Sequence, residues 1–393
     1  MTPPTTAAER RTASWMGIHR GHRARPVEWL AEKAILLVAL SAIVMVFLII
    51  AFVLREAAPV LFGRMSSAQI QTVIPVADMD KVSRETLMEY LDLDAKKFAA
   101  TDRETLKLLM EVKAEVVAEG PKDQDATLNT VSWRYLLRPH QWSGYAKPEF
   151  IWQPVSQIQK YNIVPLLVGS LKTALVALLV AVPLALAAAI YVSQLAGPRT
   201  REWVKPCIEM LSGIPSVVLG FFALIVLASV LQNVLGYASR LNAFVAGIAL
   251  ALAVIPVVFS IAEDALTSVP RSYTQAALAL GASRAQAAWQ VVLPAAMPGV
   301  FAAIVLGFGR AVGETMVVLM VSGNASILSW SLFDSTRSIT ATIAAELAET
   351  VSGGHHYRLL FLIGALLFII TFLSNLVGDL VMHRLKRNAE GAA

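Results

Sequence analysis

Two ionisable residues, Arg310 and Glu314, lie four positions apart in the apolar stretch GFGRAVGETMVV at residues 307–318. A guanidinium stays charged, and its planar fork can donate two parallel hydrogen bonds to an oxyanion. A carboxylate can accept a hydrogen bond from a protonated oxygen, which a fully ionised anion does not offer. The pair is therefore a candidate for a substrate pathway that passes an oxyanion carrying a proton. The alternative is structural: an i,i+4 pair whose charges neutralise each other or fasten two helices.

The composition indicates that the surrounding elements span a membrane. Hydrophobic residues make up 56% of the 393 positions and charged residues only 16%, which is too apolar for a soluble enzyme of this length. The net charge of +5 comes from basic residues beside apolar runs, without interleaved aromatics, so a nucleic-acid partner is not expected. The single cysteine, Cys207, excludes an intrachain disulfide, and we expect no metal site. His355 and His356 point in different directions as neighbours and are expected in a solvated loop.

Six apolar segments are long enough to cross a hydrocarbon core of about 30 Å at 1.5 Å per residue. They are residues 34–54, 166–195, 211–231, 243–261, 298–321 and 359–381. We therefore expect an all-α membrane protein with six transmembrane helices. Arg310 lies about halfway along the fifth segment, where a charge costs roughly 2.5 kcal/mol or more. It should face a bundle interior or a polar pathway.

The distribution of Lys and Arg predicts the orientation. Fourteen of them flank the segments on the side of the N-terminus, whereas the short loops opposite hold only Arg240, Arg337 and Arg358. This bias places both termini in the cytoplasm. The expected organisation is a cytoplasmic segment 1–33, a first helix 34–54, an extracytoplasmic excursion 55–160, a transmembrane core 161–382 with a cytoplasmic loop 263–296, and a cytoplasmic tail 383–393.

The excursion is predicted to contain one amphipathic helix at residues 102–119, because Thr101 and Glu104 have capping-box spacing and Gly120-Pro121 is a stop signal. Its apolar face could pack on the membrane domain or on a partner. The tryptophans Trp133, Trp142 and Trp152 are expected to anchor the chain at the membrane interface. Lys172, near the outer end of the second segment, is expected to reach the lipid headgroups.

A second pathway candidate is Gly213-Ile-Pro215-Ser216 in the third segment. Pro215 removes one backbone hydrogen bond and is expected to kink the helix, and Ser216 can re-satisfy a freed carbonyl. A plain kink is the alternative to substrate contact, and these residues alone favour the kink.

The cytoplasmic loop predicts two short helices. Gly281 ends the first, and a second from Ser283 is ended by Leu293-Pro294. Such a unit could be a plain re-entry loop, a DNA-binding helix-turn-helix or a docking unit for a cytoplasmic motor. Only Arg271 and Arg284 are basic and both ends are tethered to membrane segments, which disfavours DNA.

The spacing of this loop resembles the EAA signature of ABC importer permeases, Glu-Ala-Ala, three residues, Gly, nine residues, a branched aliphatic, any residue, Leu-Pro. The matching positions are Gln275, Ala276, Ala277, Gly281, Val291, Leu293 and Pro294. The resemblance implies that this loop is a coupling helix seated in a cleft of the ATPase. Gln275 stands where the family has an acid, which removes the carboxylate for a salt bridge there but leaves the docking unit.

Further motifs resemble the PstC-type permease subunit of the high-affinity phosphate ABC importer, in the PstC/PstA family with the type I importer architecture. They are EMLSGIPSVVLG, GFGRAVGETMVVLMVSGN, TATIAAELAE and GGHHYRLLFLIGALLFIITFLSN, together with LREAAPVLF at the end of the first segment. The resemblance covers roughly residues 28–62 and 152–387, and residues 65–147 lie outside it.

This resemblance implies a transport subunit and not an enzyme. No P-loop spacing occurs in the sequence, so ATP and Mg are expected on a partner ATPase dimer (PstB-like). A sister permease (PstA-like) and an extracytoplasmic phosphate-binding protein (PstS-like) complete the implied importer, which lies in the cell inner membrane. The alternatives are a permease for another oxyanion such as sulfate or molybdate, a secondary carrier, or a membrane-anchored regulator. A carrier would need its own ion-coupling groups and inverted repeats, which the sequence does not show.

Overall fold

The computed structural model describes residues 26–391, with gaps at 66–74, 77–78, 80–81, 83, 92, 94, 120–124, 126–127 and 157. The chain divides into two compact units, Met1–Arg55 and Glu56–Ala393. The first unit holds most of α2 (Pro26–Leu61), one long helix of largely apolar sequence. The predicted cytoplasmic segment 1–33 falls mostly outside the described residues.

The prediction of six membrane helices is confirmed. Among the described residues, six helical segments are long and apolar enough to cross a membrane: Trp29–Leu61, Val164–Leu195, Ser216–Leu235, Ala243–Thr267, Arg284–Gly313 and His355–Arg384. Four of these segments are longer than the predicted apolar runs, at one end or at both. The fifth and the third differ from the prediction in ways that matter for the candidate site.

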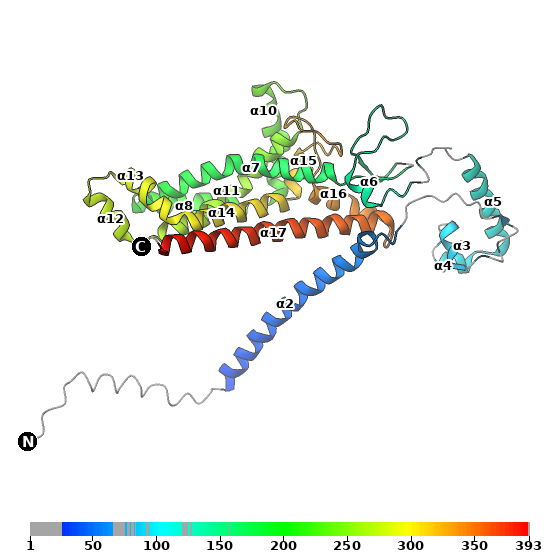
Figure 1. The fold of residues 1–393 in the computed structure, drawn as a ribbon, viewed down its shortest axis with the longest axis horizontal. Coiled ribbons are helices and arrows are strands. Elements are labelled where there is room, and N and C mark those ends of the chain that lie inside the picture. Colours follow the sequence, from blue (N-terminus) through cyan, green and yellow to red (C-terminus); the bar gives the residue numbers. More distant parts are fainter. Residues whose placement is uncertain are drawn as a thin grey trace, which may run out of the picture. The chain divides into compact units, whose positions relative to one another are not determined.

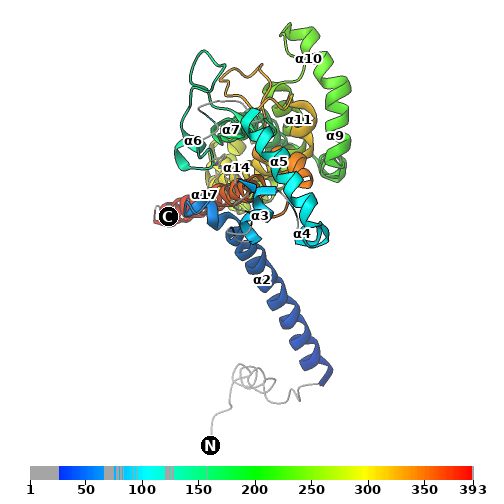
Figure 2. The same ribbon diagram turned by 90° about the vertical axis from the view of Figure 1, so that its right-hand side faces the viewer.

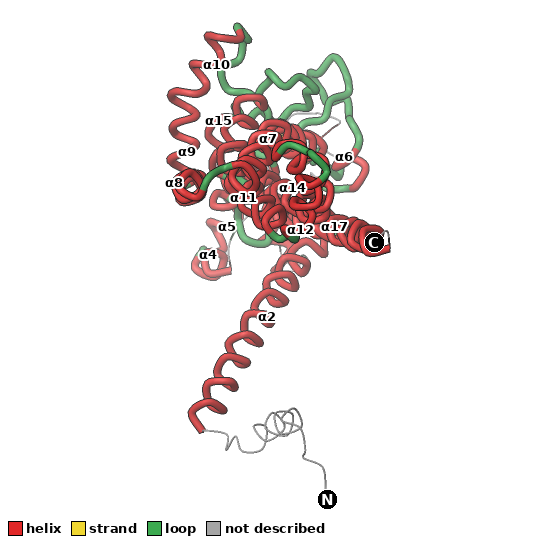
Figure 3. Tube along the Cα trace, turned by 90° about the vertical axis from the view of Figure 1, so that its left-hand side faces the viewer, coloured by secondary structure: helices red, strands yellow, loops and turns green. Residues whose placement is uncertain are grey.

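The second unit is a helical bundle built around three closely packed helices. They are α7 (Val164–Ile190), α11 (Ala243–Thr267) and α14 (Leu293–Gly313). The helix α17 (His355–Gly391) packs along α14. Figure 1 shows the four helices side by side, and the end views in Figures 2 and 3 place α9 and α17 on opposite sides of α11 and α14.

Small residues bring these helices into close contact. One face of α7 is a buried stripe of alanines at helical spacing, Ala174, Ala177, Ala181, Ala185 and Ala189. A Cβ on Gly247 of α11 would collide with the side chain of Val176, and one on Gly307 of α14 would lie 2.6 Å from Val258. Helix association in membranes relies on such close backbone approach, because lipid removes the hydrophobic driving force between helices.

The remaining spans are less regular. A π-helical turn η3 (Tyr191–Leu195) ends the second span, and the amphipathic helix α8 (Pro198–Met210) and a 3-10 turn η4 (Leu211–Gly213) follow. The third span consists of α9 (Ser216–Phe222), the π turn η5 (Ala223–Leu227) and α10 (Ala228–Leu235).

The end of the bundle that carries α12 and α13 is opposite the end that carries α6 and α16 (Figure 1). At the first end lie α12 (Arg271–Ala279), α13 (Arg284–Ala287) and the π turn η6 (Ala288–Val292). At the other end lie α6 (Trp133–Leu137), β1 (Trp152–Gln153), β2 (Lys160–Tyr161), α15 (Met316–Val321), α16 (Ile339–Glu346) and the 3-10 turn η7 (Leu347–Glu349). β1 and β2 pair antiparallel, with Trp152 opposite Tyr161.

The predicted excursion contains three further helices, α3 (Arg84–Leu91), α4 (Ala95–Ala100) and α5 (Arg103–Glu119). The helix α5 confirms the amphipathic helix predicted at 102–119. Its buried apolar residues include Leu106 and Met110, and it packs against α3.

Candidate functional site

Arg310 lies in the last turn of α14, a helix inside the fifth candidate span. The side chain is exposed in the single chain, and it shares the exposed face of α14 with Leu306 and Gly313. Among the described residues, it forms no hydrogen bond or ion pair that would neutralise it. The partial negative charge at a helix C-terminus favours a cation in this position. Contact with lipid, in contrast, disfavours a charged side chain. A charge at this place in a membrane helix is costly unless a polar path or another protein chain faces it.

Glu314 lies at a break in the fifth span and not within a helix. It is the C-cap of α14 with extended backbone angles (φ −72°, ψ 132°), and α15 begins two residues later. Thr340 of α16 donates from Oγ1 to the carbonyl oxygen of Glu314 at 2.9 Å, which satisfies a carbonyl that the helix end leaves free. The expected continuous helix over 298–321 is therefore wrong, and Arg310 and Glu314 are not an i,i+4 pair on one helix face.

The third span also differs from its prediction at Gly213, Pro215 and Ser216. Pro215 does not kink a helix. It separates η4 from α9 as the N-cap of α9 (φ −57°, ψ 135°), and Ser216 is the first helical residue. Because Pro has a fixed φ and no N–H, it suits the start of a helix better than its interior.

The segments that follow the two breaks pack against each other. A Cβ on Gly220 of α9 would lie 2.8 Å from Sδ of Met320 and 3.3 Å from Cα of Val317, both in α15. The structure therefore packs α9 against α15, the two helices that follow the breaks at Pro215 and Glu314. Extended backbone inside a membrane segment is tolerated where protein or a water-filled path surrounds it.

The predicted docking unit forms two short helices with a glycine turn between them. Gln275 and Ala276 are exposed on α12 and Ala277 is buried. Gly281 adopts φ +87° after the end of α12, the left-handed conformation that glycine adopts without steric cost. Ser283 then forms a capping box with Gln286 at the start of α13.

The second helix of this unit does not end at Leu293 and Pro294 as predicted. The chain runs from α13 through the π turn η6 directly into α14, and Pro294 lies in the first turn of α14. The missing N–H of Pro is harmless there, because first-turn N–H groups have no partner within the helix. The segment predicted to dock is thus continuous with the helix that carries Arg310.

Large apolar side chains are exposed around this turn. Leu280, beside Gly281, is 91% exposed, and Tyr273, Leu278 and Trp289 are between 40% and 53% exposed. Such a group at the end of a span is typical of a protein interface.

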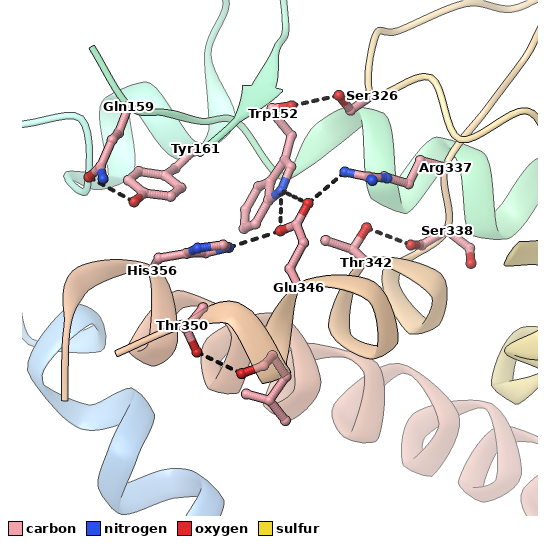
Figure 4. A network of polar contacts seen from close by, with 11 residues as sticks. Trp152, Gln159, Tyr161, Ser326, Arg337, Ser338, Thr342, Glu346, Thr350 and His356 are labelled. Atoms are coloured by element: carbon pink, nitrogen blue, oxygen red, sulfur yellow. Dashed lines mark hydrogen bonds and ion pairs between the residues drawn. The ribbon is translucent and has the colours of Figure 1, made fainter. Parts of the chain in front are cut away.

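A buried polar network forms the opposite end of the second unit (Figure 4). The carboxylate of Glu346 accepts from Arg337 Nη1 at 2.6 Å and from Trp152 Nε1 at 3.0 Å, and lies 2.9 Å from His356 Nε2. His356 lies in the first turn of α17 and not in a solvated loop, and Trp152 is fully buried and not an interfacial anchor. Trp142 is also buried. Burial and the charge of Glu346 raise the pKa of the Tyr161 phenol, which lies beside Trp152.

Lys172 is buried and does not reach the headgroups. Its Nζ donates to the carbonyl oxygens of Ser329 and Ser331, at 3.0 and 2.8 Å. These bonds hold the loop between α15 and α16 against α7, so the lysine has a structural role.

The prediction missed one polar residue of the sixth span. Asn375 of α17 is exposed, and its Oδ1 lies 3.9 Å from a Cβ built on Gly309, the neighbour of Arg310. The signal was present in the sequence, because an amide within the apolar run LFIITFLSNLVG needs a hydrogen-bonding partner inside the membrane.

Comparison with known proteins identifies the family. Residues 156–390 match the family described as binding-protein-dependent transport system inner membrane component. The chain belongs to this family. Membership implies an inner-membrane, multi-pass permease that works with an ATPase and a substrate-binding protein, and it confirms the predicted fold class and the class of transport subunit.

Individual relatives are about one third identical to the chain over the aligned residues. It is 34% identical over 235 residues to the probable ABC transporter permease protein YqgH of Bacillus subtilis, covering 59% of this chain and 76% of the relative. It is 33% identical over 255 residues to the phosphate transport system permease protein PstC of Pasteurella multocida, covering 60% and 78%. A solved structure of the MetNI methionine ABC transporter in inward-facing conformations is similar at 17% identity with a TM-score of 0.43, covering 57% of this chain and 94% of that one.

Proposed function

We propose that this chain is the transmembrane permease subunit of an ATP-driven importer of inorganic phosphate. It forms half of the translocation path and couples that path to a cytoplasmic ATPase. The name of the relative from Pasteurella multocida supports phosphate as the substrate. The observation in this chain that carries the proposal is the guanidinium of Arg310, exposed on a membrane helix without an intrachain partner among the described residues.

The roles of the two ionisable residues follow from the chemistry of phosphate. Arg310 neutralises the anion and donates hydrogen bonds to its oxygens, and it loses little on desolvation because a guanidinium is weakly hydrated. Glu314, at the break after α14, accepts from a protonated phosphate oxygen and repels a fully ionised anion. The extended backbone at Glu314 and the helix start at Pro215 and Ser216 provide the irregular segments that line such a path.

The partners fit two surfaces. A sister permease (PstA-like) covers the exposed face of α14 at Leu306, Arg310 and Gly313, because that face cannot remain in lipid. An ATPase dimer (PstB-like), which binds ATP and Mg, receives the exposed apolar side chains around Gly281. In this arrangement Gln275, Ala276, Ala277, Gly281, Leu293 and Pro294 form the coupling segment.

The orientation and the delivery of substrate are part of the same proposal. Both termini and the α12–α13 end lie in the cytoplasm, as the Lys and Arg distribution predicts. A phosphate-binding protein (PstS-like) docks at the other end.

The test is uptake of labelled phosphate, with sulfate and molybdate as competitors, in vesicles that contain the complete complex. Arg310→Gln should lower phosphate uptake by about tenfold to a hundredfold, the loss expected for charge-assisted hydrogen bonds. Arg199→Gln is a matched control, because Arg199 is exposed on α8. Full-rate uptake by Arg310→Gln at normal membrane level would disprove the transport role. ATP-dependent uptake of sulfate or molybdate without phosphate would assign a different oxyanion.

A further inference from the structure

A buried carboxylate joins the end of the fourth span, α11, to the amphipathic helix α8. Glu263, four residues before the end of α11, is fully buried. Its Oε1 accepts from Arg201 Nη2 at 2.5 Å and from Thr267 Oγ1 at 3.1 Å, and its Oε2 accepts from Lys205 Nζ at 2.7 Å. Arg201 and Lys205 lie one turn apart on α8. We call Glu263, Arg201 and Lys205 the α8–α11 clasp.

The α8–α11 clasp is not the arrangement that would hold two helices together most stably. Removing a carboxylate and two cations from water is costly, and apolar residues of similar volume stabilise a helix contact as well or better. What a buried ion pair can add is a defined register between two helices. Lys205 Nζ also lies 3.8 Å from Oδ1 of the exposed Asp264, but only Glu263 is contacted by both cations. The two cations remain partly exposed, with 38% and 30% of their side chains accessible, whereas Glu263 is at 1%. The carboxylate is therefore the fixed centre of the clasp.

The position of the clasp connects the docking unit to a break in the membrane core. On the α11 side, the chain leaves Thr267 and enters α12 at Arg271, the first helix of the docking unit. On the α8 side, the chain leaves Met210 and passes through η4 to the interruption at Pro215. A separate bond ties the end of α11 to the turn before α8, since Gln194 Nε2 of η3 donates to the carbonyl oxygen of Leu266 at 3.3 Å.

We propose that Glu263 is a positioning residue for coupling, which transmits movement of the α12–α13 docking unit to α8 and thereby to the break before α9. This inference rests on the proposed function for the identity of the motor and the substrate. Along the chain, Pro215 is connected to α12 only through α9, α10 and the whole of α11. The clasp joins the last turns of α11 directly to α8, next to the contact that α11 makes with η4. Lys205 supports the same geometry, since its hydrogen bond to Glu263 raises the pKa of the ammonium and keeps it charged.

The test compares Glu263→Gln with Glu202→Gln in the complete complex reconstituted in vesicles with ATP and inorganic phosphate. Glu202 is exposed on α8 next to Arg201, so the same chemical change there should alter transport by less than about twofold. Glu263→Gln should assemble with the ATPase and hydrolyse ATP, while phosphate transported per ATP hydrolysed falls by about tenfold. An unchanged ratio would overturn the inference, and so would a proportional loss of assembly, hydrolysis and uptake, which a purely structural role produces.

A second measurement does not depend on the transported ion. With Cys207→Ser as background, Ser212→Cys in η4 reports movement at the break through nucleotide-dependent reaction with a thiol reagent. Glu263→Gln should abolish the nucleotide dependence, and Glu202→Gln should preserve it. Lys205→Met, which leaves Arg201 on the carboxylate, replaces Glu263→Gln if that variant does not accumulate, and should lower the same two readouts. If the unmodified complex transports no phosphate but shows the thiol response, the proposed substrate is wrong and the clasp is still tested.

Discussion

The indole Nε1 of Trp152 donates to the carboxylate of Glu346 at 3.0 Å, across 194 positions of sequence. Trp152 lies in β1 and Glu346 ends α16, and the same carboxylate contacts Arg337 and His356 (Figure 4). One side chain therefore fastens four segments at the end of the bundle opposite the docking unit. The side chains of Glu346 and Arg337 are only 11% and 19% exposed, so little solvent screens their interaction.

Glu346→Gln should destabilise the protein, because it leaves the guanidinium of Arg337 buried without a counter-charge. The expected loss is roughly 2 to 4 kcal/mol in the free energy of unfolding. Thermal unfolding of the purified protein in detergent measures it. Glu349→Gln is the matched control, since Glu349 is exposed three residues later and should change the midpoint little. Equal midpoints for the two variants would contradict a stabilising role for the network.

Gly169→Ala should weaken the contact between α7 and the segment that precedes α16. A Cβ at this position would overlap the carbonyl oxygen of Arg337 and lie 2.7 Å from Thr336 Oγ1, so backbone has to move at a cost of about 1 to 3 kcal/mol or more. Gly364→Ala in α17 is the control, because its Cβ would make an ordinary 3.6 Å contact with Ile343. Gly364→Ala should leave the free energy of unfolding unchanged or raise it by up to about 1 kcal/mol, because alanine has the higher helix propensity. Unfolding midpoints that rank the two variants in the opposite order would contradict this packing.

Several features that local sequence determines were predicted correctly, although the prolines Pro215 and Pro294 begin helices where a kink and a helix end were predicted. Apolar length defined the six spans, and the stop signal after Glu119 and the glycine at Gly281 marked two helix ends. These features depend on residues within a few positions of each other, which is the range over which helix patterns and caps act.

The features that depend on distant partners were not predictable in this way. Lys172 looked like a headgroup anchor because its partners, the carbonyls of Ser329 and Ser331, lie more than 150 positions away. No proline marks the helix break at Glu314 in the sequence. The break is stabilised by Thr340 of a later helix, which donates a hydrogen bond to the carbonyl oxygen of Glu314. The burial of Glu263 could not be foreseen without knowing that α8 turns its two cations towards the end of α11.

Stability at alkaline pH should depend on Tyr161. Its folded-state pKa is raised above the unfolded value of 10.0 by burial and by Glu346. The neutral phenol therefore stabilises the fold fully below about pH 10, and that contribution falls as the pH rises further, by about 1.4 kcal/mol per pH unit. Tyr161→Phe should lower the free energy of unfolding by about 1 kcal/mol near neutral pH, because it removes the hydrogen bond from the phenol to Gln159.

The free-energy difference between the unmodified protein and Tyr161→Phe should shrink and then reverse above about pH 10. Unfolding midpoints measured from about pH 8 to about pH 11 follow this crossover. Tyr191→Phe, at an exposed tyrosine of the second span, should show no such crossover. A constant difference across this range for Tyr161→Phe would mean that its pKa is not raised.

The conformation of Gly281 should control docking of the ATPase. Its φ of +87° suits glycine, and nothing lies within 4 Å of a Cβ built there, so a substitution acts through backbone strain and not through collision. Gly281→Val should re-aim α12 against α13 at a cost of about 1 to 2 kcal/mol, which corresponds to a loss of about tenfold in ATPase association. Gly281→Asn should lower ATPase association less, because Asn tolerates the left-handed region.

Co-purification of the ATPase at equal membrane levels measures the series of Gly281 variants, with Ala282→Val as a neighbouring control. If Val and Asn at position 281 associate as well as glycine, the turn has no role in docking, and the exposed Leu280 and Trp289 have to act independently of it.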